Sequence, residues 1–104
     1  MSFYVIVMEV VVLVEMELLY KSKLILNSGL VEEIAFWKVP KNEHFPEGIK
    51  YRLLLIDPVW KKVLLLLDNE FPEYDYRFSS IESLIKYFFE LRTIAEKNYE
   101  NNEN

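Results

Sequence analysis

Helical spacing of apolar residues occurs once in this sequence, near its C-terminal end, and this feature constrains the fold most strongly. The apolar stripe has the three- and four-residue spacing of one helical face, and its members are Ile81, Leu84, Ile85, Phe88, Leu91 and Ala95. Ser79 and Glu82 have the spacing of a capping box at its start. We therefore predict one amphipathic helix that opens at Ser79 and frays near Lys97, followed by a disordered tail over residues 98–104.

The residues before the helix alternate with the two-residue period of extended chain or run continuously apolar. The predicted strands cover residues 3–14, 15–26, 30–39, 49–56 and 60–67, and a last short strand is open for residues 76–78. Turn residues separate the later strands at 27–29, 40–48 and 57–58. The pattern predicts one α+β domain over residues 1–97, a meandering antiparallel sheet of about five strands with one C-terminal amphipathic helix packed on it.

Composition limits the classes of function that the chain can serve. It contains no Cys, and His44 is its only His, so a metal site built on thiolates or several imidazoles is excluded. A disulfide-stabilised secreted domain is disfavoured, and we expect a cytoplasmic protein without metal or cofactor. The net charge of −5 argues against broad, sequence-independent binding to nucleic acid, although it is compatible with a local basic patch.

The apolar run over residues 3–14 is rich in Val, which favours a buried strand. Its twelve residues are too few for a membrane-spanning helix, which needs about 20, and no secretory signal pattern is present. We expect no membrane partner. The natural start is open among Met1, Met8 and Met16. An apolar content of 52% fits either a dense core or a surface that a second copy or a partner covers.

A cationic pair and an acidic strand end form the first candidate site. Lys50 and Arg52 share one strand parity, and the turn at residues 57–58 folds the next strand back so that their cationic face lies beside Asp68, Asn69 and Glu70. Such a face could hold a phosphodiester and position a general base, and the candidate catalytic group is Lys50, Arg52, Asp68 and Asn69. The alternative is a cross-strand ion pair on a solvated sheet face, with Asp-Asn acting as a turn signal.

Aromatic residues beside basic ones form a second candidate site, because such residues can stack and hold nucleobases. The candidate binding residues are Tyr51, Trp60 and Arg77, and Trp60 stands beside two lysines at a predicted hairpin tip. Core packing is the alternative role for the aromatic rings. The acidic residues at positions 70, 73 and 75 do not have the spacing of an EF-hand, so we expect no metal site there.

The order of these motifs resembles the TumE-like family of small proteins from bacterial and archaeal toxin–antitoxin operons. The resemblance covers about residues 18–91, and its motifs are Leu19-Tyr20-Lys21 with Gly29, Trp37 before Val39-Pro40, Lys50-Tyr51-Arg52, Asp68-Asn69, and Tyr76-Arg77-Phe78 before Ser79-Ser80-Ile81-Glu82. Family members commonly carry His residues in the loop after Asp-Asn, whereas residues 70–75 contain none. The site candidates that carry over are therefore Lys50, Tyr51, Arg52, Asp68 and Asn69.

The resemblance implies a toxin that is neutralised by an antitoxin partner with a DNA-binding helix-turn-helix. Action on RNA, as a ribonuclease or by other chemistry, is a candidate because Lys50 and Arg52 could hold phosphate, and whether the protein is an enzyme stays open. The alternative function is a non-enzymatic interaction module, either a homodimer or a subunit of a complex, whose apolar interface covers the first strand. A small-ligand binder is a third interpretation, for which the sequence offers no ligand-specific feature.

Overall fold

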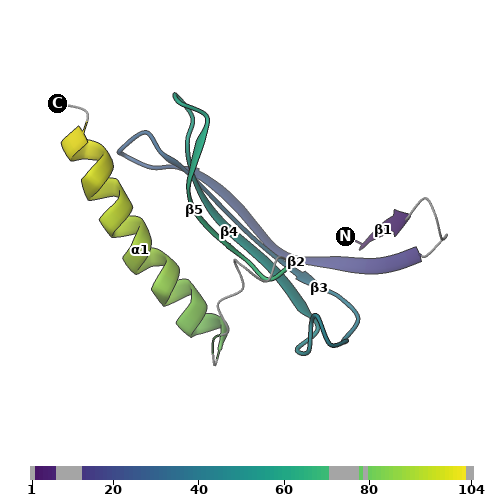
Figure 1. The fold of residues 1–104 in the computed structure, drawn as a ribbon. Coiled ribbons are helices and arrows are strands. Elements are labelled where there is room, and N and C mark those ends of the chain that lie inside the picture. Colours follow the sequence, from purple (N-terminus) through teal and green to yellow (C-terminus); the bar gives the residue numbers. More distant parts are fainter. Residues whose placement is uncertain (1, 7–12, 71–77, 79, 103–104) are drawn as a thin grey trace.

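The fold is an antiparallel sheet with one helix laid against it. The computed structural model describes residues 2–6, 13–70, 78 and 80–102. The strands follow one another in chain order across the sheet, and the elements are β1 (Ser2–Ile6), β2 (Leu13–Ile25), β3 (Val31–Lys38), β4 (Ile49–Asp57), β5 (Lys62–Asp68) and α1 (Ile81–Asn102) (Figure 1). The predicted α+β class, the antiparallel meander and the single C-terminal helix are confirmed.

The N-terminal part of the sheet differs from the prediction of one strand over residues 3–14. The structure divides this run between β1 and the start of β2, which pair antiparallel from Ser2 opposite Glu17 to Ile6 opposite Leu13. The body of the sheet is the four strands β2–β5, and the short β1 forms an arm with the first part of β2 that projects beyond them (Figure 1). Of the short strand proposed for residues 76–78, only Phe78 is described, and it lies outside any strand.

Two faces of the sheet follow from the strand pairing. Ile34 of β3 pairs with Leu53 of β4, which pairs with Leu67 of β5, and these three side chains are buried on one face. Leu84 and Phe88 of α1 complete the same core cluster. The middle of the predicted apolar stripe therefore faces the sheet, whereas Ile81 at its start is 48% exposed. Residues of the opposite parity, among them Lys50 and Arg52, project from the face that the helix does not cover.

The helix begins at a serine cap. The Ser80 hydroxyl accepts a hydrogen bond from the Ser83 backbone N–H at 3.1 Å, which satisfies one of the donors left open at a helix start. The predicted cap, Ser79, lies outside the described residues. Ser80 therefore serves as the observed cap, and the predicted start of the helix is close to its actual position.

The helix ends later than predicted. It continues through Asn102 instead of fraying near Lys97, and the Tyr99 hydroxyl in its last turns lies 3.4 Å from a carboxylate oxygen of Asp57 at the end of β4. The prediction considered only local polarity, and it missed this tertiary contact. The predicted disordered tail is therefore corrected for residues 98–102.

A buried ion pair joins the helix to the sheet. Glu32 of β3 is only 1% exposed, and one of its carboxylate oxygens accepts a hydrogen bond from the Arg92 guanidinium of α1. The Arg92 guanidinium also lies 4.5 Å from the centre of the Phe89 ring. Within the described ranges, no helix combines the length and the apolar character that crossing a bilayer requires.

Candidate functional site

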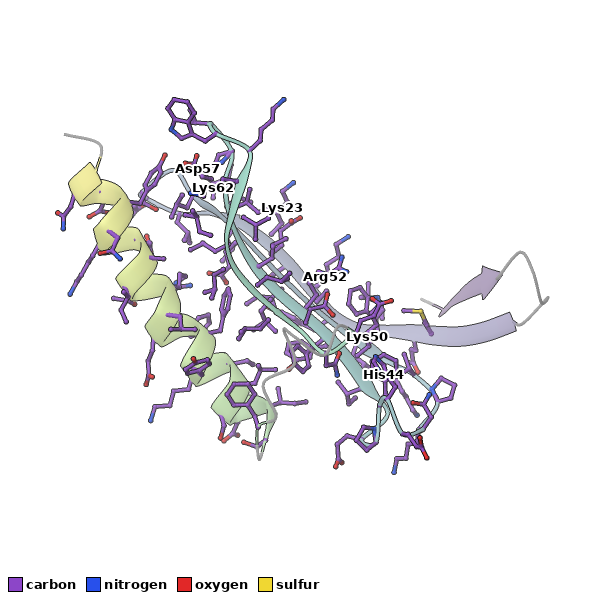
Figure 2. All side chains as sticks on the ribbon, viewed as in Figure 1. Lys23, His44, Lys50, Arg52, Asp57 and Lys62 are labelled. Carbon is purple, nitrogen blue, oxygen red and sulfur yellow. The ribbon has the colours of Figure 1, made fainter. Side chains whose placement is uncertain are left out.

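The four residues of the predicted catalytic group do meet in the structure. Arg52 of β4 is the direct pairing partner of Asp68 at the end of β5, and Lys50 lies two residues earlier on the same strand and the same face. Figure 2 shows Lys50 and Arg52 together along β4, with Asp57 and Lys62 at the far end of the β4–β5 hairpin. The parity and hairpin argument from the sequence is therefore confirmed for this cluster.

Asp68 fixes the position of Arg52. Arg52 Nε donates a hydrogen bond of 2.8 Å to Asp68 Oδ2, and the Asp68 side chain is 1% exposed while that of Arg52 is 44% exposed. Asp68 Oδ1 accepts a second hydrogen bond, of 2.8 Å, from the backbone N–H of Glu70. Since both carboxylate oxygens accept hydrogen bonds and the group is buried, Asp68 orients the guanidinium and does not abstract a proton from a substrate.

Lys50 is held by a different set of neighbours. Its Nζ lies 2.8 Å from Glu70 Oε2 and 5.3 Å from the centre of the Trp37 ring on β3. Arg52 Nη2 lies 3.9 Å from the same Glu70 oxygen. The two cations therefore converge on one carboxylate. The sequence prediction placed Glu70 beside this face but counted neither Glu70 nor Trp37 among the candidate site residues.

Asn69 has a structural role at this strand end. Its side-chain oxygen accepts a hydrogen bond of 2.9 Å from the Tyr51 backbone N–H, and its amide nitrogen donates one of 2.8 Å to the Ile49 carbonyl oxygen. The side chain thus bonds two backbone groups of β4, just beyond the last paired residue of β5. Asn69 positions the start of β4 and is not placed to contact a ligand as a catalytic group.

Of the predicted binding residues, Tyr51 and Trp60 do not join this cluster. Tyr51 has the opposite parity to Lys50 and Arg52, so its side chain is buried in the core beside Phe36. Trp60 lies at the tip of the β4–β5 hairpin, beyond a stretch of strand from Arg52 to Asp57 that spans about 16 Å. Arg77 lies outside the described residues.

Trp60 belongs to a separate surface at the hairpin tip. Its side chain is 78% exposed, and the neighbouring Val59 is 73% exposed. The tip turns through Lys61, which has a positive φ of 52°. A groove lies between the tip and the end of α1, and its lining residues are Asp57, Trp60, Lys62, Leu64, Ala95, Asn98 and Tyr99.

The chemistry open to the Lys50–Arg52 cluster is the binding of an oxyanion. It offers a guanidinium and an ammonium group on one face, and no cluster of metal-ligating side chains occurs among the described residues. Glu73 and Asp75, two of the acidic residues for which no metal site was expected, lie outside those residues. His44 is exposed in the loop between β3 and β4, where its ring contacts Phe45 edge-on, and it is not part of the cluster.

Sequence reasoning also missed the pairing of Glu32 with Arg92. Glu32 stands on β3 two residues before Ile34 and has the same parity, so its place on the core face follows from the strand period. Its partner comes from the helix, sixty residues later in the chain. Only tertiary structure brings these two residues together.

Comparison with known proteins adds no relative for this chain. No protein-family model, no curated protein and no solved structure matches it. The function is therefore inferred from the geometry of the cluster and from the order of the sequence motifs.

Proposed function

We propose that this chain is the toxin component of a toxin–antitoxin module and that it contacts RNA through Lys50 and Arg52. The observation that carries the proposal is the exposed Arg52 guanidinium, which buried Asp68 holds in one orientation on the uncovered face of the sheet. An oriented guanidinium with a neighbouring ammonium group suits the phosphate of a nucleic-acid backbone. The motif order that resembles the TumE-like family supports the same proposal.

The proposal assigns phosphate binding, and no bond cleavage, to these residues. Asp68 is unsuited to act as a base because its side chain is only 1% exposed, which keeps it away from a substrate proton. A net charge of −5 restricts RNA contact to this local patch. The proposed partner is an antitoxin with a DNA-binding helix-turn-helix, and the proposed location is the cytoplasm.

Expression of the chain without a partner should arrest bacterial growth, and Arg52→Ala should relieve the arrest. The reason is that Arg52 supplies the oriented donors of the cluster. Colony counts after induction measure the effect, and thermal unfolding of each purified variant checks that it folds. Lys97→Ala, which removes an exposed cation of α1, is the matched control and should leave the arrest unchanged. Normal growth with the folded wild-type chain would contradict the proposal.

The second candidate is a non-enzymatic interaction module that forms a homodimer or joins a larger complex. A specific observation favours it, because large apolar side chains are exposed on the helix-covered side of the sheet, at Tyr20 and Leu24 of β2, and on α1 itself at Phe89. The interface first predicted over residues 3–14 concerns side chains that the structure does not describe. This candidate predicts a stable oligomer in solution.

A further inference from the structure

Glu70 occupies the position that an external anion would take between the two cations of the site. Its Oε2 lies 2.8 Å from Lys50 Nζ and 3.9 Å from Arg52 Nη2. The cluster therefore balances two positive charges, on Lys50 and Arg52, against two negative charges, on Asp68 and Glu70. An incoming phosphate group would have to replace the Glu70 carboxylate.

The two carboxylates of the cluster differ in how firmly they are held. The Asp68 side chain is 1% exposed and both of its oxygens accept hydrogen bonds, so the guanidinium stays oriented whatever Glu70 does. The Glu70 side chain is 42% exposed. Glu70 itself lies in a turn, two residues after the end of β5. The Lys50 side chain is only 17% exposed, so its ammonium group needs another anion when Glu70 moves away, and a phosphate group can supply one. Glu70 can therefore be exchanged for an external anion, while Arg52 keeps its position.

The donors on Arg52 fit this exchange. Nε donates to Asp68 at 2.8 Å, whereas Nη2 lies 3.9 Å from Glu70 Oε2, which is beyond hydrogen-bonding distance. Lys50 Nζ lies over the Trp37 ring, 5.3 Å from its centre. A phosphate group has several acceptor oxygens and can bond both cationic groups at once.

We propose that Lys50 and Arg52 form a phosphate-binding site that the Glu70 carboxylate masks, so that Glu70 competes with the ligand. This inference rests on the proposed function insofar as the ligand is the RNA backbone, and it adds a regulatory residue to that site. The masking carboxylate sets the affinity of the site, and Asp68 sets the orientation of its guanidinium.

Titration calorimetry of the full chain tests the masking with two probes, inorganic phosphate and a short single-stranded oligoribonucleotide. Glu70→Gln keeps the shape of the side chain and removes its charge, so it should bind the probes about three- to tenfold more tightly than the wild-type chain. Adding Arg52→Ala to that variant should abolish the gain. Glu100→Gln, which changes an exposed carboxylate of α1, is the matched control and should leave the affinity unchanged.

The outcomes separate this inference from the proposed function. Equal affinities for Glu70→Gln and the wild-type chain, with unchanged melting temperatures, would overturn the masking even where Arg52→Ala relieves growth arrest. A gain in affinity for Glu70→Gln without growth arrest by the wild-type chain would support the masking and overturn the toxin proposal. A gain with inorganic phosphate alone would support the masked site and assign it to a small phosphorylated ligand.

Discussion

The Asn69 side chain holds the start of β4 through two hydrogen bonds to its backbone. Its amide accepts from the Tyr51 backbone N–H and donates to the Ile49 carbonyl oxygen, at 2.9 Å and 2.8 Å. Asp68 and Glu70 on either side of it hold the two cations. Three consecutive residues therefore supply both the side-chain hydrogen bonds that hold the start of β4 and the two carboxylates of the site. Interpreting Asp-Asn as a turn signal alone accounts for neither role.

At the scale of the residue, Asn69→Ala should lower the free energy of unfolding by about 1–2 kcal/mol, because it removes two hydrogen bonds at a partly buried strand end. Denaturant unfolding measures the loss, and faster hydrogen exchange at the Tyr51 amide should accompany it. Asn101→Ala at an exposed position of α1 is the matched control and should change stability by no more than about 0.5 kcal/mol. Equal unfolding midpoints for the two variants would show that the hydrogen bonds of the Asn69 side chain contribute nothing to stability.

The positions of the two cations of the site could be predicted from the sequence, whereas the contacts of its carboxylates could be predicted only in part. Strand parity placed Lys50 and Arg52 on one face, and the short turn at residues 57–58 brought Asp68 to Arg52. The same parity buries Tyr51, and the prediction went wrong there because it treated an aromatic beside two cations as a surface residue. The contact of Glu70 with both cations was not predicted, because a turn residue has no strand parity to fix the direction of its side chain.

At the scale of the element, α1 and the two N-terminal strands show where local sequence rules hold and where they fail. The helical stripe predicted which residues face the sheet, and Leu84 and Phe88 do lie in the core. The end of the helix was not predictable from local sequence, because residues 98–102 carry no Gly or Pro and their helical state depends on the contact of Tyr99 with β4. The division between β1 and β2 was missed for a similar reason, since residues 7–12 contain no turn-forming residue.

Two adjacent Phe residues of α1 test the packing of the helix on the sheet. Phe88 is fully buried, whereas Phe89 is 39% exposed. Phe88→Ala should cost about 3–5 kcal/mol because it leaves a cavity in the core, and Phe89→Ala should cost about 1 kcal/mol or less, chiefly from its lost contact with Arg92. Denaturant unfolding of both variants gives the comparison. Similar losses for the two would mean that the helix does not use the predicted stripe to face the sheet.

At the scale of the whole molecule, one helix covers only part of the sheet. A helix is about 10 Å wide and strands lie about 4.8 Å apart, so α1 can cover about two of the four strands of the sheet body. Tyr20 and Leu24 of β2 have the same parity as core residues of β3, yet they are 54% and 51% exposed. The radius of gyration, 15.7 Å, exceeds the value of about 13 Å expected for a compact chain of this length, in keeping with the projecting arm.

The uncovered part of the helix side predicts self-association if the second candidate function is right. Light scattering should then show an oligomer, and Leu24→Lys should convert it to a monomer by placing a charge on the apolar surface. Ile25→Lys is the matched control, because Ile25 is 79% exposed on the opposite face and its replacement should leave the oligomer intact. A monomeric wild-type chain at high concentration would count against this candidate and favour the toxin proposal.

The contact between Asp57 and Tyr99 links the hairpin tip to the end of the helix. One carboxylate oxygen of Asp57 accepts hydrogen bonds from the backbone of Val59 and Trp60 at the hairpin tip, and the Tyr99 hydroxyl lies 3.4 Å from that same oxygen. The backbone of the hairpin tip and the last turns of the helix thus share one hydrogen-bond acceptor. A change in the tip that moves Asp57 would therefore also alter the contact that holds the end of the helix.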